Sequence, residues 1–435
     1  MSIKHLSALM MLVLSLAFFV YSQVGFADPA LACSADFYIS ETMPNGSRWE
    51  LCWEHRQREG IVYHDITFTT PNGERRKVLN QAHLAQLHVP YDDDGARYHD
   101  VTDFGLGGIA LQGLNSADCP NGTLRDLDGK NILCQRLIPR GYAYKDAEQQ
   151  QQGYLLTLYS TSLVGAYNYI FEWRLYDDGT IEPVAGATGR LQRFGTDAQY
   201  GWPIRDDGTV GLSHTHNYYW RLDFDLNGTS DDDVVEEFNF IPVENNTKYE
   251  LTTTQLITES ARSINPDTQR GWRIVDSTTN VEGHAISYQI DLHNLGHRDE
   301  GPVSEPWTFH DFYVTENKPC EQFASHNPTA EGCAADLSAF VNDEMIQDAV
   351  VWVGLTFHHI PRDEDEPNMH AHWNSFQLVP RDWTPSNLLA SSTVGQTAVD
   401  VQEIETTVGV TPLLVLFVIL LGVTGLFFGR LLRKK

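Results

Sequence analysis

The chain has 435 residues, and its 58 acidic side chains outnumber its 30 lysines and arginines, which gives a formal net charge of −28. Nucleic-acid binding requires a basic surface, so this balance argues against a nucleic-acid partner. It suits a soluble body outside the cytoplasm and is compatible with small cationic substrates.

Residues 1–27 predict a secretory signal peptide. Lys4 and His5 precede an apolar run over 6–20, and small residues at Gly25 and Ala27 offer a cleavage point before Asp28. An uncleaved N-terminal anchor is the alternative. The apolar run is shorter than a membrane anchor requires, because a bilayer span needs roughly 20 residues.

Residues 28–385 predict one large all-β sandwich. Segments rich in aromatic and β-branched residues alternate with Asn-Gly and Asp-Gly pairs, which is typical of strands joined by tight turns. Helical periodicity is scarce, and short helices are expected only at 81–86 and 337–345. The expected strands include 61–69, 154–160, 169–176, 218–225 and 285–292.

The six cysteines favour structural disulfides formed in an oxidising compartment, since no C-x-x-C redox spacing occurs. They fall into three pairs that are local in sequence, although six cysteines allow many other connectivities. The expected pairs are Cys33 with Cys52, Cys119 with Cys134, and Cys320 with Cys333.

The C-terminal part predicts a membrane anchor. Residues 386–405 have the composition of a linker, and 406–429 form an uncharged apolar run followed by a basic tail at 430–435. Such a run is long enough to span a bilayer, and the basic tail is expected on the cytoplasmic side. The body is therefore expected on the extracytoplasmic side, periplasmic or extracellular, as part of a single-pass protein.

Histidines provide the first candidate for a metal site. In a strand, residues i and i+2 face the same way, so His214 and His216 can present two imidazoles to one ion, with His359 as a remote third ligand. His370 and His372 form a rival pair, and spacing alone does not choose between the two. Imidazole ligands suit copper as well as zinc.

One carboxylate and two phenols are candidates for chemistry beside that ion. Asp100 precedes a glycine-rich, apolar stretch, where desolvation would raise its pKa and make it a proton acceptor near neutral pH. A solvated or turn-capping aspartate is the simpler interpretation of this residue. Tyr91 and Tyr167 are equally consistent with core strand aromatics.

Taken together and in order, these segments resemble the catalytic domain, and that domain alone, of the copper amine oxidases. The resemblance covers roughly residues 58–380. The matching segments are REGIVYHDI (58–66), VPY (89–91), YHDVTDFGLGG (98–108), the Cys119/Cys134 bracket, YNYIFEWRLYDDGTIEPVAGATG (167–189), HTHNYYWRLDFDLNG (214–228) and DAVVWVGLTFHHIPRDEDEPNM (348–369).

The resemblance assigns a role to each matching position. It implies that Tyr167 is converted by copper and dioxygen to topaquinone, that Asp100 is the general base, and that Tyr91 hydrogen-bonds a quinone oxygen. Tyr98 matches the residue that often gates the substrate channel. The implied copper ligands are His214, His216 and His359.

The resemblance also implies a peripheral calcium site, since hard oxygen ligands suit that ion. The matching ligands are the carboxylates of Asp223, Asp225 and Asp348 and the carbonyls of Phe224 and Ala349.

The activity implied is the oxidative deamination of a primary amine by dioxygen to an aldehyde, ammonia and hydrogen peroxide, in a homodimer. The motif around the cofactor tyrosine departs from the family's Thr-x-x-Asn-Tyr-[Asp/Glu]-Tyr. Leu163, Ala166 and Asn168 replace the Thr, the Asn and the acid. An alternative is therefore a copper-binding relative without quinone, acting as a metal-binding or interaction module.

Overall fold

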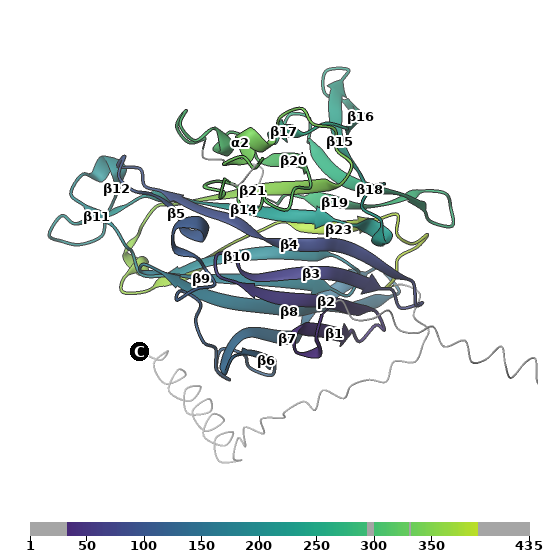
Figure 1. The fold of residues 1–435 in the computed structure, drawn as a ribbon, viewed down its shortest axis with the longest axis horizontal. Helices are drawn as coiled ribbons and strands as arrows, with labels where there is room; N and C mark the ends of the chain where they lie inside the picture. Colours follow the sequence, from purple (N-terminus) through teal and green to yellow (C-terminus); the bar gives the residue numbers. More distant parts are fainter. Residues whose placement is uncertain (1–32, 294–299, 330–331, 390–435) are drawn as a thin grey trace, which may run out of the picture. The chain divides into compact units, whose positions relative to one another are not determined.

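Two large antiparallel sheets packed face to face form the body of the protein (Figure 1). The computed structural model describes residues 33–293, 300–329 and 332–389. The predicted all-β sandwich is confirmed. Indole rings join the sheets, since Trp173 of one lies 5.5 Å, centroid to centroid, from Trp220 of the other.

The first sheet contains the strands that matter most for the metal site. Their order is β1 (Tyr38–Thr42), β2 (Arg48–Arg56), β3 (Gly60–Thr69), β4 (Arg75–Pro90), β14 (His214–Phe224), β21 (Ala349–His359), β20 (Phe312–Glu316) and β17 (Ser260–Arg262), and β5 (Arg97–His99) pairs with β4.

The second sheet covers one face of the first. Its order is β16 (Lys248–Leu256), β15 (Val234–Val243), β18 (Gly271–Thr279), β19 (Ala285–Asp291), β23 (Gln377–Arg381), β10 (Ile181–Gly189), β9 (Tyr167–Tyr176), β8 (Gln150–Val164), β7 (Lys130–Lys145) and β6 (Thr123–Leu127), and β22 (Met369–Ser375) pairs with β10. A small third sheet contains β11 (Phe194–Gly195), β13 (Val210–Leu212) and β12 (Gly201–Pro203).

The described helices are all short. The predicted helix at 337–345 is confirmed only as one turn, α2 (Leu337–Phe340). The helix predicted at 81–86 is wrong, because these residues lie within β4, whose positions 82–90 are all buried. The other short helices are η1 (Ala35–Phe37), η2 (Asp100–Phe104), η3 (Ala198–Tyr200), η4 (Leu226–Gly228), η5 (Pro306–Thr308) and η6 (Asp363–Asp365).

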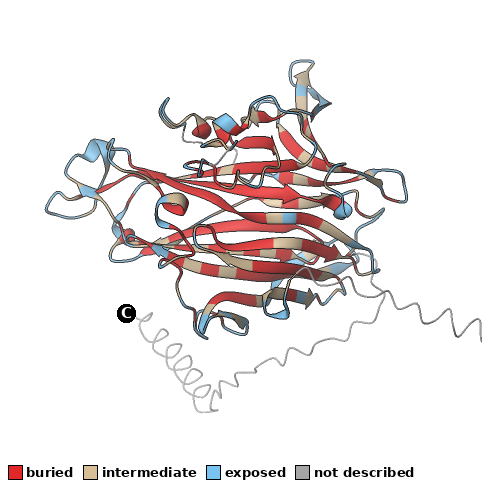
Figure 2. Ribbon diagram, in the orientation of Figure 1, coloured by how far each residue is buried: buried red, intermediate tan, exposed pale blue. Residues whose placement is uncertain are grey.

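Strand β14 is buried along its whole length, as the unbroken red strand in Figure 2 shows. One face packs against the second sheet through residues such as Trp220. The other face, which carries Tyr219, is covered by a smaller apolar cluster that includes Trp307 and Phe340. Both faces of the strand are therefore dry.

The three expected disulfides are confirmed as Cys33–Cys52, Cys119–Cys134 and Cys320–Cys333. The signal peptide at 1–27, most of the linker, the apolar run at 406–429 and the basic tail lie outside the described residues. Within the described ranges, no helix has the length and apolar character needed to cross a membrane.

Candidate functional site

Strand register brings the three predicted histidines together. His214 and His216 lie on the same face of β14, and the antiparallel pairing places His359 of β21 directly opposite His214. One ring nitrogen from each lies within 4.8 Å of the other two. The face they share is the one turned toward the second sheet.

Two of these histidines each donate one ring N–H to the protein, which leaves a lone pair on the other ring nitrogen. Nδ1 of His214 donates to the Leu212 carbonyl at 3.0 Å, so its Nε2 carries the lone pair. Nε2 of His359 donates to Oδ2 of Asp365 at 3.0 Å, which leaves its Nδ1 as the lone-pair atom. These two nitrogens face each other at 3.3 Å.

Neither ring nitrogen of the fully buried His216 has a hydrogen-bond partner in the described structure. Burial also lowers the pKa of His214 to about 3 and the pKa of His216 well below its usual value, so both rings are neutral. Three neutral imidazoles with converging lone pairs fit a transition-metal ion, and the donor set suits copper or zinc.

The rival histidine pair does not converge. His370 is exposed, whereas His372 lies beside His359, with ring centroids 4.9 Å apart, in a second group completed by Asp365. His372 therefore borders the site of the other three histidines instead of forming a site with His370.

Tyr167 reaches the histidines from the second sheet. It is the first residue of β9, whose buried residues alternate with half-buried ones along the strand. Its hydroxyl donates to Nε2 of His214 at 2.7 Å and lies 3.3 Å from Nδ1 of His359. Tyr167 is thus a core aromatic whose polar end lies at the predicted metal position.

A cavity of about 200 Å³ adjoins Tyr167 and gathers the other predicted catalytic side chains. We call it the Tyr167 cavity. Tyr98 is half-buried in its wall, and the 55 % exposed Phe104 packs near Tyr98. The residues lining it are Val89, Tyr91, Tyr98, Asp100, Phe104, Val164, Gly165, Tyr167, Tyr169 and Gln192.

Asp100 is only 3 % exposed at the start of η2. Burial raises the pKa of its carboxyl to about 7, although a hydrogen bond with Tyr169 opposes the shift. The desolvation considered for Asp100 from the sequence agrees with its burial. A carboxyl with such a pKa is half ionised at neutral pH, as a general base requires.

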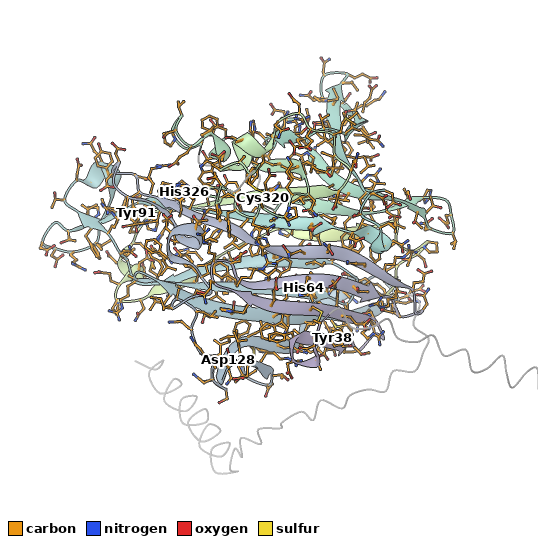
Figure 3. The ribbon with its side chains drawn as sticks, in the orientation of Figure 1. Tyr38, His64, Tyr91, Asp128, Cys320 and His326 are labelled. Carbon is orange, nitrogen blue, oxygen red and sulfur yellow. A yellow bond between two sulfur atoms is a disulfide. The ribbon has the colours of Figure 1, made fainter. Side chains whose placement is uncertain are left out.

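Tyr91 packs between the cavity and the histidines. It directly follows β4, on the side of the molecule where β5 lies (Figure 3). Its ring stacks on His214 at 4.6 Å, and the Arg193 guanidinium lies 5.2 Å from the centroid of the ring. Among the described residues its hydroxyl has no hydrogen bond with Tyr167, so its role toward a quinone oxygen stays a prediction.

Two residues that the sequence did not single out support this site. Asp365 accepts a hydrogen bond from His359, and the side-chain oxygen Oε1 of Gln192 accepts a hydrogen bond from the Ala166 backbone N–H at 3.0 Å. Asp365 lies in an acidic run that is indistinguishable by sequence from a solvated loop.

The carboxylates implied for calcium are held by the protein's own groups. Lys77 pairs with Asp225 at 2.8 Å, and the Asn317 side-chain amide donates to Asp348 at 3.0 Å and to Asp223 at 3.3 Å. Within the described ranges, these three carboxylates do not form a group with all ligand atoms inside 4.8 Å. Oδ1 of Asp225 and Oδ1 of Asp348 are buried without a hydrogen-bond partner in the described structure, and the calcium assignment stays a prediction.

The fold and site define a β-sandwich protein with three converging buried histidines, a candidate metal centre, beside a buried tyrosine. The family model described as copper amine oxidase, enzyme domain, matches residues 140–398. The chain therefore belongs to the copper amine oxidase family.

Curated relatives agree with this assignment. A primary amine oxidase of Arthrobacter sp. (strain P1) is 26 % identical over 396 residues, covering 81 % of this chain and 60 % of the relative. A primary amine oxidase of Klebsiella aerogenes is 26 % identical over 390 residues, covering 76 % of this chain and 51 % of the relative. The chain thus spans 60 % or less of the length of these two relatives.

Solved structures support the fold. A copper-containing benzylamine oxidase from Hansenula polymorpha matches with a TM-score of 0.68 and 20 % identity, over 85 % of this chain and 65 % of that one. The lysyl oxidase of Pichia pastoris matches with a TM-score of 0.65 and 22 % identity, over 78 % of this chain and 51 % of that one.

Proposed function

We propose that the protein oxidises primary amines with dioxygen and water, yielding an aldehyde, ammonia and hydrogen peroxide. The observation that carries this proposal is the Tyr167 cavity. It places a buried carboxyl with a near-neutral pKa, Asp100, in the same space as Tyr167, whose hydroxyl bonds a histidine of the three-histidine centre.

His214, His216 and His359 would hold copper, and Tyr167 would be the precursor of topaquinone. Together the two groups would supply the redox chemistry, which takes two electrons from the amine and passes them to dioxygen. This assignment rests on the converging lone pairs of the three histidines and on family membership.

Asp100 would accept the proton that leaves the carbon next to the amine nitrogen. Its buried position keeps the carboxyl poorly solvated, and the Tyr169 hydroxyl orients one of its oxygens. The neighbouring rings of Tyr91 and Tyr98 limit the width of the cavity. They would therefore restrict how the substrate lies against the base.

A copper-binding relative without quinone is the second candidate. It is favoured by Leu163, Ala166 and Asn168, which replace the family's residues around Tyr167. Asn168 also has a buried side-chain oxygen with no hydrogen-bond partner in the described structure. A tyrosine with such neighbours could remain unmodified beside the metal.

One experiment separates the two candidates. The protein is prepared free of metal and loaded with copper under air, and its peptides are examined by quinone redox-cycling stain and mass mapping. The oxidase requires a stain and a modified residue at Tyr167, with both absent from Tyr167→Phe. An unmodified Tyr167 after complete copper loading would establish the quinone-free relative.

We also propose that the body lies on the extracytoplasmic side, anchored by residues 406–429, and that it forms a homodimer. The three disulfides support an oxidising location. Protease added to intact cells should release the body while leaving the basic tail protected. Light scattering of the released body should give twice the mass of one chain.

A further inference from the structure

Three carboxylates meet beyond the end of β14 that is far from the histidines. Asp232 and Asp233 immediately precede β15, and Asp276 lies in β18. Val234 pairs with Val275 across these strands, so the next position along the ladder sets Asp233 opposite Asp276. Strand β14 alone is roughly 30 Å long at about 3.3 Å per residue, which separates this cluster from the three-histidine centre.

These carboxylates are buried and close together. Asp276 is 1 % exposed, Asp233 is 5 % exposed and Asp232 is half-buried. One oxygen from each lies within 4.8 Å of the others. Like charges directly opposite in a sheet are destabilising, so something positive must compensate them.

The protein's own groups satisfy only half of the carboxylate oxygens. The Leu226 N–H donates to Oδ2 of Asp233 at 2.8 Å, and the Thr278 N–H donates to Oδ1 of Asp276 at 2.6 Å. The Ser277 hydroxyl donates to Oδ2 of Asp232. The remaining oxygens are buried and have no hydrogen-bond partner among the described residues: Oδ1 of Asp232, Oδ1 of Asp233 and Oδ2 of Asp276.

No lysine or arginine in the described ranges forms an ion pair with these three carboxylates. This distinguishes the cluster from the carboxylates matched to the family's calcium site, where Lys77 already pairs with Asp225. Burial and the charges of its acidic neighbours raise the pKa of Asp233 to about 8, which reflects the same lack of compensation.

We propose that Asp232, Asp233 and Asp276 bind a divalent cation of the calcium type. Oxygens that share a calcium ion at about 2.4 Å are no more than about 4.8 Å apart, and the ligand oxygens of this cluster meet that limit. Calcium accepts six to eight oxygens in flexible geometry, and half-buried Asp232 leaves one side open for water ligands. The cation would tie the loop before β15 to β18.

The test uses the full-length protein, stripped with EDTA and titrated with calcium chloride. Bound calcium is measured by elemental analysis, and the unfolding temperature is measured with and without calcium. Asp276→Asn and Asp233→Asn should each lose one calcium per chain and the calcium-dependent rise in Tm. The exposed Asp231→Asn, in the same acidic run, should keep both.

The unfolding temperature in EDTA distinguishes loss of calcium binding from general destabilisation of the variant. In EDTA, Asp276→Asn should unfold at the same temperature as wild type or higher, because one repelling charge is gone. If it does not fold, Asp232→Asn replaces it. Asp223→Asn should leave the Asp276-dependent calcium in place.

Two results would overturn the proposal. One is unchanged calcium content and Tm response in both Asp276→Asn and Asp233→Asn. The other is a wild-type Tm that responds to pH near 8 but not to calcium. That result would show that the carboxylates share a proton and bind no cation.

Discussion

Tyr167 depends on groups that lie far from it in the sequence. Its hydroxyl bonds His214, and the turn before it is held by Gln192, whose side-chain oxygen accepts the Ala166 N–H. Gln192 also lines the Tyr167 cavity. A side chain from the segment after β10 thus holds the backbone at the position where the local motif has Ala166 in place of asparagine.

Replacing Gln192 with alanine should slow quinone formation at Tyr167, because the Gly165–Ala166 turn loses its anchor. A displacement of about an ångström costs some hundredfold in rate, so a 10- to 100-fold slowing is expected. The measurement is the time course of redox staining after copper addition, with copper affinity unchanged. Gln199→Ala, at an exposed position, is the matched control, and an equal rate in both variants would refute a positioning role for Gln192.

The pKa of Asp100 predicts the acid limb of the activity profile. Because the base works only when ionised, kcat/KM should rise as pH increases through about 7. Asp103→Asn should move this limb to lower pH without lowering the plateau, since the Asp103 charge helps to raise the pKa of Asp100. Asp100→Asn should lose about 10²- to 10⁴-fold at every pH. An acid limb that stays in place in Asp103→Asn would contradict this account.

At the scale of elements, the end of β21 is tied to the helical turn that follows it. Oδ2 of Asp365, in η6, accepts from Nε2 of His359 at 3.0 Å and from the Arg362 N–H at 3.0 Å. This fixes the tautomer and the ring orientation of His359. Groups that hold a metal-binding histidine in this way strengthen metal binding.

Asp365→Asn should therefore weaken copper binding by about 10- to 100-fold. The affinity is measured by competition with a chelator of known strength. Asp363→Asn changes an exposed residue of the same turn and should bind copper like the wild type. Equal affinities for the two variants would show that Asp365 does not support the ligand.

The sequence predicted the parts of the site that follow a local period. His214 and His216 are expected on one face because they are two residues apart, and the strand expected at 169–176 from its aromatic and β-branched residues lies within β9. His359 could be chosen over His370 only through resemblance to a family, because register between distant strands is not a local property. Gln192 and Asp365 were missed for the same reason, since each acts on a partner that only the fold brings close.

The helix wrongly predicted at 81–86 has a related cause. Strand β4 is buried on both faces over 82–90, so its apolar residues do not alternate. A fully buried strand and a short buried helix look alike by periodicity. The second apolar layer that covers β4 and β14 was not visible from the sequence.

At the scale of the whole molecule, the three predicted copper ligands come from one sheet and Tyr167 comes from the other. Copper should stabilise the folded state by mass action, by about 2.7 kcal/mol at a free concentration one hundred times Kd. Thermal unfolding with and without copper measures this. His216→Ala should abolish the copper-dependent rise in Tm, and replacing the exposed His370 with alanine should preserve it. If His370→Ala abolished the rise and His216→Ala preserved it, His370 and His372 would be the metal ligands instead.

The order of strands in the first sheet has a consequence for biosynthesis. Bridges Cys33–Cys52 and Cys119–Cys134 close over separations of only 19 and 15 residues, so both can form early in an oxidising compartment. Strand β14, however, needs β4 before it and β21, which ends at His359, long after it. Pairing of such distant segments is slow and requires most of the chain. If the three histidines hold copper as proposed, metal insertion would be a late event in maturation. A chain that stops before β21 would carry both disulfides yet lack His359.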